Sequence, residues 1–234
     1  MLKIFLISLT FASAFATLGY DISAYTGSRL NATTAQCLVK GGGQFFIIES
    51  YNDDGIINKN FSNAYHSLYQ AGAKLVDTSA TICTEYPPET LCSSVKSTLP
   101  ENFNGTVWLS INTFDDDCMR DTYGRFLQTL ENYVKTCQSY GMKVGINGNA
   151  NNYNWYVSGD MRRVSPFLVT LPLWYEKYDK KDSFDDFSDL DAGFGGWEMP
   201  TIKKYQGYKT VCGTSLGYNF RAPMGDKYKN LIFE

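Results

Sequence analysis

The stretch from Tyr123 to Asn147, YGRFLQTLENYVKTCQSYGMKVGIN, decides the fold class. Its first part predicts an amphipathic helix, because apolar side chains recur at helical spacing and share one face. MKVGIN then follows a glycine, and its continuous apolar character is typical of a strand buried on both faces. Helix followed by buried strand indicates one unit of an α/β fold. The expected core face of the helix carries Phe126, Leu130, Tyr133, Val134 and Cys137.

The chain before this stretch repeats the pattern. Strands are expected at residues 20–25, 44–50, 73–79 and 106–112. One helix is expected to follow threonine caps and end at Gly41–Gly43, and a second ends at Gly72. Continuous apolar strands that alternate with amphipathic helices predict parallel βαβ units.

The last third of the chain reads differently. Segments 168–178, 201–208 and 210–220 look like strands with little helix between them. There is no low-complexity linker and no internal repeat, so we expect one domain over residues 17–234. The predicted fold class is α/β, an irregular (β/α) barrel of TIM type with about five β/α units followed by strands.

The N-terminus carries the features of a signal peptide. Lys3 precedes an apolar run too short to span a bilayer, and Ala14-Phe15-Ala16 is a small-x-small cleavage signature. We expect residues 1–16 to be a signal peptide and the mature protein to be secreted and extracellular; the alternatives are a buried N-terminal strand or an uncleaved anchor. No second long apolar run exists, so no membrane association is expected of the mature chain, which we expect to be a soluble monomer.

Charge and composition exclude several classes of site. A net charge of -3 argues against electrostatic binding of nucleic acid or anionic lipid. His66 is the only histidine and there is no CxxC pair, so neither a zinc site nor a catalytic triad is expected, and no cofactor is predicted. Three glycosylation sequons, at Asn31, Asn60 and Asn104, agree with a secretory route.

Six cysteines in a secreted chain predict a disulfide framework, for which 15 connectivities exist. Cys37 follows the first strand and Cys212 lies on the last, and these strands adjoin when a barrel closes, so we pair them. We further expect Cys83–Cys92 to close a short loop and Cys118–Cys137 to tie the loop after the fourth strand to its helix.

Acidic residues gather where the predicted strands end. Active sites of barrels lie at the carboxyl ends of their strands. Carboxylates beside aromatic side chains are what glycoside hydrolysis uses, although acids also favour exposed loops in general. The acids at predicted strand ends are Asp21, Glu49, Asp77, Asp115, Asp116, Asp117 and Glu176, and the nearby aromatics are Tyr25, Tyr51, Trp174, Tyr175 and Tyr178.

Six segments in order resemble the Chalaropsis-type lysozymes of glycoside hydrolase family 25, in their animal branch. GYDISAY resembles the opening D-x-S motif, and VWLSIN occupies the place of the W-L-D-x-E strand. VGINGNANNYNWYVSG resembles Y-S-S-x-x-x-W-x-x-x-x-G. The last three, LPLWYEKYDKKDSFDDFSD, FGGWEMPTIKKYQG and VCGTSLGYNF, resemble L-W-Y-x-x-Y-D, F-G-G-W-x-x-P-x-x-K-Q-Y and V-C-G-x-x-V-D-x-N.

The resemblance implies a modified barrel that cuts β-1,4 bonds between N-acetylmuramic acid and N-acetylglucosamine in peptidoglycan. Asp21 matches the family's first-strand aspartate. Ser110 and Asn112 replace the two acids of D-x-E, and Gly217 replaces the late aspartate. The glutamate is the expected general acid, and an asparagine has no proton to give at ordinary pH. The catalytic motif is therefore degenerate.

Two principal hypotheses follow. The first is a secreted lysozyme-like protein with lost or strongly reduced hydrolysis, which acts in antibacterial defence or bacterial glycan recognition. The second is an active, atypical muramidase that uses Asp21 with a substituted acid such as Asp115, Glu49 or Glu176. A third is a digestive-tract or structural protein without glycan affinity. The residues expected to bind peptidoglycan are Tyr25, Glu49, Asp77, Asn112, Trp174 and Tyr175.

Overall fold

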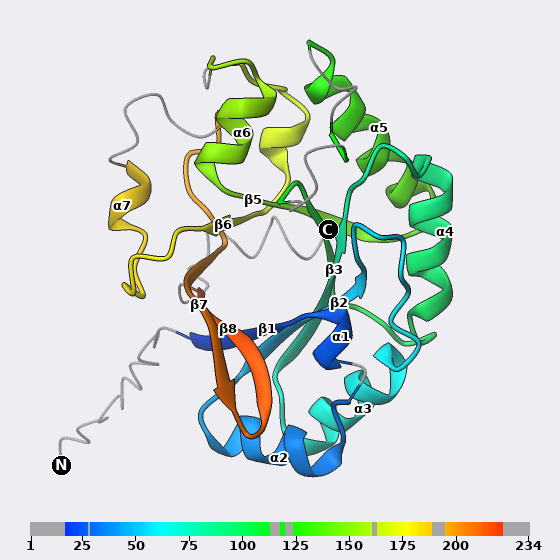
Figure 1. The fold of residues 1–234 in the computed structure, drawn as a ribbon, viewed down its shortest axis with the longest axis vertical. Helices are drawn as coiled ribbons and strands as arrows, with labels where there is room; N and C mark the ends of the chain where they lie inside the picture. Colours follow the sequence, from blue (N-terminus) through cyan, green and yellow to red (C-terminus); the bar gives the residue numbers. More distant parts are fainter. Residues whose placement is uncertain are drawn as a thin grey trace, which may run out of the picture.

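The computed structural model describes residues 17–27, 29–112, 118–119, 124–160, 163–188 and 195–221. Within these ranges the strands close into a barrel in sequence order, as Figure 1 shows. This confirms the predicted fold class. The strands are β1 Thr17–Ile22, β2 Phe45–Tyr51, β3 Leu75–Thr81, β4 Thr106–Ser110, β5 Lys143–Gly148, β6 Leu173–Glu176, β7 Ile202–Val211 and β8 Thr214–Arg221.

The direction of the last strand makes the barrel irregular. Strands β1 to β7 pair in parallel, whereas β8 runs antiparallel to both β7 and β1. A tight hairpin at Cys212-Gly213 turns β7 into β8, and both residues have positive φ, 53° and 73°. Turns of this kind match the twist of the paired strands. The strand-only tail predicted from the sequence is therefore the part that closes the barrel.

Helices cover the outside of the barrel. The structure confirms the amphipathic stripe of α5, because all five residues predicted for its core face are buried. Helix α4 was not anticipated, since its sequence is mostly polar and only Leu91, Cys92 and Val95 are buried. The helices are α1 Ala24–Gly27, α2 Ala32–Lys40, α3 Phe61–Ala71, α4 Pro88–Thr98, α5 Phe126–Ser139, α6 Ala150–Tyr156 and α7 Asp185–Ser188, with a 3-10 turn at Leu168–Thr170. No helix in the described ranges is long and apolar enough to cross a membrane.

Large aromatic side chains fill the barrel interior. Trp108 and Trp174 meet edge to face with their ring centroids 6.2 Å apart. Gly145 makes room for one of them, because a Cβ at that position would lie 2.5 Å from the Trp108 ring. The interior cluster consists of Phe45, Ile47, Trp108, Trp174 and Ile202. This packed layer fills the barrel interior, so a ligand could enter only at an end of the barrel.

One predicted disulfide is present and two were wrong. Cys37 pairs with Cys212, with the Cα atoms 6.0 Å apart, and ties α2 to the β7–β8 hairpin. The other bridges are Cys83–Cys118 and Cys92–Cys137 rather than Cys83–Cys92 and Cys118–Cys137.

The reason is the unpredicted helix α4. It carries Cys92 away from Cys83 and places it against Cys137 on the neighbouring α5. Cys83 and Cys118 instead follow β3 and β4, which are adjacent parallel strands, so their loops meet at one end of the barrel. A backbone hydrogen bond of 2.7 Å from Thr84 N–H to the Cys118 carbonyl reinforces that contact.

The three sequons have different surroundings. Asn31 and Asn104 are exposed. Asn31 also caps helix α2 through its side-chain oxygen, which leaves its amide nitrogen available. Asn60 is half-buried, and its amide nitrogen donates to the carbonyls of Gly27 and Leu30, each over 3.3 Å. Asn31 and Asn104 are therefore better placed to carry a glycan than Asn60.

Candidate functional site

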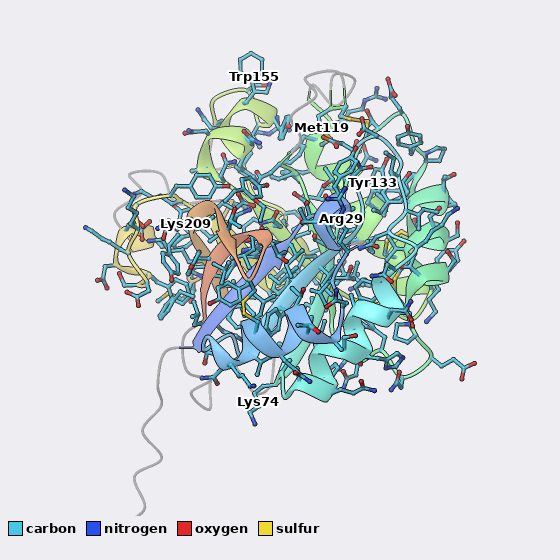
Figure 2. The ribbon with its side chains drawn as sticks, turned by 60° about the horizontal axis from the view of Figure 1, so that its bottom comes forward. Arg29, Lys74, Met119, Tyr133, Trp155 and Lys209 are labelled. Atoms are coloured by element: carbon cyan, nitrogen blue, oxygen red, sulfur yellow. A yellow bond between two sulfur atoms is a disulfide. The ribbon has the colours of Figure 1, made fainter. Side chains whose placement is uncertain are left out.

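A cleft of about 350 Å³ opens at the carboxyl ends of the parallel strands. Figure 2 helps to locate this end: Lys74, which precedes β3, projects at the bottom of the view, whereas Trp155 on α6, which follows β5, projects at the top. The cleft brings together most of the residues predicted from the sequence. Those are Asp21, Tyr25, Glu49, Ser110, Asn112, Trp174, Glu176 and Tyr178.

Two predicted binding residues lie elsewhere. Asp77 was placed at the end of its strand, but β3 continues to Thr81, so Asp77 is 1% exposed within the barrel wall. Its carboxylate accepts hydrogen bonds from Trp108 Nε1 and Thr106 N–H, over 2.9 and 2.8 Å. Tyr175 points the opposite way from Trp174 along β6 and packs against Phe187 outside the barrel. The placement of both residues in a glycan groove was wrong, and Ser79 and Thr81 line the cleft instead.

Asp21 is held by two partners, one on β7 and one on β8. Lys204 Nζ lies 2.8 Å from Asp21 Oδ2, and Asn219 Nδ2 donates to Asp21 Oδ1 over 2.8 Å. Gly217 faces Asp21 across the β1–β8 pair. Each carboxylate oxygen of the one acid that matches the family motif thus already has a partner inside the protein.

Asn112 has a fixed orientation. Its Oδ1 accepts from the backbone N–H of Asn149 over 3.2 Å, from Asn149 Nδ2 over 2.8 Å and from Asn152 Nδ2 over 3.3 Å. A backbone N–H can only donate, so the atom facing it must be the oxygen of the amide. Ser110 Oγ accepts from the Asn112 N–H over 3.1 Å and helps to hold this turn. Nδ2 of Asn112 is buried and has no hydrogen-bond partner in the described part of the chain.

Glu49 and Glu176 are the remaining carboxylates at strand ends. Burial raises the pKa of Glu49 above its ordinary range, although hydrogen bonds from the Ala24 N–H and the Thr81 hydroxyl act in the opposite direction. Glu176 accepts from Asn147 Nδ2 over 3.0 Å and from the Tyr178 hydroxyl over 2.9 Å. Glu49 is therefore the cleft carboxyl group for which burial favours the protonated form.

Comparisons with known proteins identify the family of this chain. A family model described as "Lys-1: Lysozyme-like protein 1" matches residues 12–205. "Probable GH family 25 lysozyme 4" of Dictyostelium discoideum is 30% identical over 227 residues, which cover 94% of this chain and 98% of that protein. The chain belongs to the lysozyme-like proteins of glycoside hydrolase family 25.

Solved structures of family 25 lysozymes share the barrel. A lysozyme of this family from Aspergillus fumigatus superposes with a TM-score of 0.70 at 16% identity, over 93% of this chain and 99% of its own. The autolysin LytC from Streptococcus pneumoniae, solved with a synthetic peptidoglycan ligand, gives a TM-score of 0.61 at 13% identity, over 88% of this chain and 46% of its own. At such identities the likeness establishes the fold alone.

Sequence reasoning missed several residues of this family 25 site. Lys204 stands where the motif K-Q-Y has its glutamine, and this departure in KKY was the available signal. Asn149 and Asn152 gave no signal, because their role appears only once α6 sits beside Asn112. Asp115, Asp116 and Asp117, considered as substitute acids, lie outside the described residues. Within those residues no cluster of His, Cys, Asp or Glu could hold a metal ion.

Proposed function

We propose that this family 25 protein is secreted and binds bacterial cell-wall glycan with lost or strongly reduced hydrolysis, in antibacterial defence or in bacterial recognition. The observation that carries the proposal is the state of Asn112. It stands where the family motif has its glutamate, and its oxygen is occupied by three donors. Its remaining polar atom, the Nδ2 amide, can only donate hydrogen bonds, and it is buried beside the cleft without a partner in the described chain.

Hydrolysis of a glycosidic bond needs a proton donor and a second carboxylate. Asn112 and Ser110 replace the D-x-E pair, and neither carries an ionisable proton at ordinary pH. Asp21 remains, but its Oδ2 lies 2.8 Å from Lys204 Nζ in an ion pair. A general acid contributes about 10²–10⁴-fold to such a reaction, so its loss together with its partner supports a cleft that binds without cutting.

The walls of the cleft suit a sugar chain. Tyr25, Tyr178 and Tyr208 line it and are exposed, at 60%, 56% and 56%. Aromatic rings provide flat apolar faces with a polar tip, a combination that stacks on sugar rings while it remains solvated. An amide N–H at Asn112 suits the carbonyl of an acetamido group. Peptidoglycan, whose sugars both carry acetamido groups, is therefore the proposed partner, and we propose that the protein binds it as a monomer.

The disulfides support the secretory part of the proposal. Three bridges join the six cysteines, and the described chain contains no free thiol. Such bridges persist in oxidising compartments and are rare in the cytosol. Expression with the native N-terminus and sequencing of the mature protein from the culture medium tests secretion and the expected cut after Ala16.

Two assays on the same purified protein test the central proposal. We expect it to sediment with insoluble peptidoglycan and to leave the turbidity of a Gram-positive cell-wall suspension unchanged, while an active family 25 lysozyme clears that suspension. Clearing by the natural protein would refute the loss of hydrolysis. Failure to sediment with peptidoglycan would refute the glycan role.

One observation favours the alternative of an active, atypical muramidase. Glu49 lies in the cleft with a pKa that burial raises, and a raised pKa is what a carboxyl group needs to serve as a proton donor. If the natural protein clears cell walls, Glu49→Gln and Asp21→Asn separate the candidates. Loss of clearing by a folded Glu49→Gln variant identifies Glu49 as the acid, and loss by an Asp21→Asn variant that is still folded at the assay temperature identifies Asp21 as a catalytic group.

A further inference from the structure

The floor of the cleft is occupied by a buried ammonium group. The side chain of Lys204 is 5% exposed, and its Nζ lies 2.8 Å from Asp21 Oδ2. Three aromatic rings surround it, with centroids 6.0 Å away for Trp174, 5.9 Å for Tyr178 and 5.0 Å for Tyr208. A cation between a carboxylate and ring faces is well compensated for its loss of water. The ammonium group of Lys204 thus occupies the space between Asp21 and the three aromatic rings.

The charge on Lys204 is stable at physiological pH. Burial acts to lower its pKa, but the negative charges of Asp21 and Glu176 outweigh that effect and raise the pKa well above its ordinary value. Asp21 therefore has a permanent counter-ion. Any use of its carboxylate toward a ligand would first require a buried ion pair to separate, which is costly.

Gly217 is fitted to this pair. A Cβ at position 217 would lie 2.7 Å from Lys204 Cε and 3.0 Å from Asp21 Cγ, and it would also overlap Asp21 Oδ1. The φ of Gly217 is outside the left-handed region, so the backbone does not call for glycine. Glycine is therefore needed at position 217 because the ion pair leaves no space for a Cβ atom. A side chain at position 217, where the family motif has an aspartate, is incompatible with the observed ion pair.

We infer that Lys204 is a plug in the floor of the cleft and that Gly217 is its coupled partner, so that Asp21 serves as the counter-ion of the plug and not as an acid or base toward a ligand. The loss of the late acid and the gain of a lysine are on this view one structural change. The inference goes beyond the proposed function, and its test measures unfolding in the absence of glycan, so either can fail without the other.

A charge-pair cycle provides the first test. Asp21→Asn leaves a buried ammonium without its counter-ion, and Lys204→Gln leaves a buried carboxylate without its cation. Each single variant should lower the melting temperature by about 6 °C or more, whereas Asp21→Asn/Lys204→Gln should melt closer to the natural protein than either does. Asp53→Asn is the control, because it removes a cleft carboxylate other than the one Lys204 binds. A double variant that melts at or below the less stable single variant would overturn the inference.

A second cycle tests the role of Gly217 and remains informative if one charge variant fails to fold. Gly217→Ala should lower the melting temperature by about 4 °C or more in the natural background, because the added methyl displaces the ion pair. The loss should be at most half as large in the Lys204→Gln background, where Asn219 alone holds Asp21 and its side chain can turn aside more easily. Gly207→Ala is the matched control, since a Cβ there meets nothing within 4 Å. Equal losses in both backgrounds would show that the two positions are not coupled.

Discussion

Asn149 donates both its backbone N–H and its side-chain amide to Oδ1 of Asn112, over 3.2 and 2.8 Å. The oxygen of Asn149 meanwhile caps helix α6 by accepting from the N–H of Asn152. The start of α6 therefore fixes the amide that stands in the place of the family's general acid. Orientation in advance of binding is what makes a single hydrogen-bond donor effective.

Replacement of Asn112 by aspartate tests this donor. Asn112→Asp keeps the shape and the accepting oxygen but turns the Nδ2 donor into a second acceptor. Binding of N-acetylated oligosaccharides should weaken about 3- to 10-fold, the value of one hydrogen bond, as measured by isothermal titration calorimetry. Asn151→Asp, on the exposed side of α6, adds the same charge and should bind like the natural protein. Unchanged affinity in Asn112→Asp would remove Asn112 from the binding surface.

The raised pKa of Glu49 predicts how the stability of the protein depends on pH. Its raised folded-state pKa means that the folded protein holds this proton more tightly than the unfolded chain does. The free energy of unfolding should therefore fall as the pH rises above about 4.5, the ordinary pKa of the group. Asp77 is shifted in the same direction by its burial and contributes to the same slope.

The variant Glu49→Gln isolates the contribution of Glu49. It removes the ionisable group. The melting temperature of the variant minus that of the natural protein should therefore increase as the pH is raised from 4.5 to 7. Thermal melts of both proteins across this range measure the difference directly. Glu85→Gln, at an exposed position, is the control and should run parallel to the natural protein. A difference between Glu49→Gln and the natural protein that shrinks with rising pH would contradict the assigned direction.

The features that could be predicted from the sequence are those that depend on the hydrophobic pattern and on the order of the motifs. The barrel and α5 were predictable because their apolar periodicity is visible in the residues themselves. Asp21, Ser110 and Asn112 were placed correctly at the cleft because each follows or ends a recognisable strand. Tyr175 was misplaced although strand alternation alone puts it opposite Trp174, so that error was avoidable.

Other features depend on tertiary contacts that no local pattern reveals. The run after Asp77 does not show where β3 ends, because small polar residues continue the strand to Thr81. Lys204 reads locally as a surface lysine, and its burial makes sense only beside Asp21 on a distant segment of the chain. The cysteine pairing failed for the same kind of reason, since it required the position of α4.

The disulfide assignment can be checked on the natural protein. Non-reducing peptide mapping should recover Cys83 linked to Cys118 and Cys92 linked to Cys137. The bridges close 35- and 45-residue separations, so removal of either pair by serine substitution should cost about 3–4 kcal/mol in the free energy of unfolding. Denaturant titration measures that loss. A peptide that joins Cys83 to Cys92 would contradict the structure and restore the pairing expected from the sequence.

Restoration of the lost acids is the most direct test of the chemistry. Ser110→Asp/Asn112→Glu returns a proton donor and a carboxylate to the ends of their strands. The control Ser110→Asn/Asn112→Gln has side chains of matching size without charge. We expect the acidic variant to clear peptidoglycan at least about tenfold faster than this control, since a general acid contributes about 10²–10⁴-fold.

The gain from the two restored acids alone should stay below the full contribution of a general acid, about 10²–10⁴-fold. Asp21 remains bound to Lys204, and position 217 still lacks its acid. Adding Lys204→Gln and Gly217→Asp to the acidic pair should therefore raise the rate further, because the plug is removed and the space it used can accept a carboxylate. Gly217→Asp without Lys204→Gln should instead impair folding, since the new side chain overlaps the ion pair. Equal rates in the acidic pair and its amide control, with both variants folded, would mean that the cleft no longer positions a glycan for cleavage.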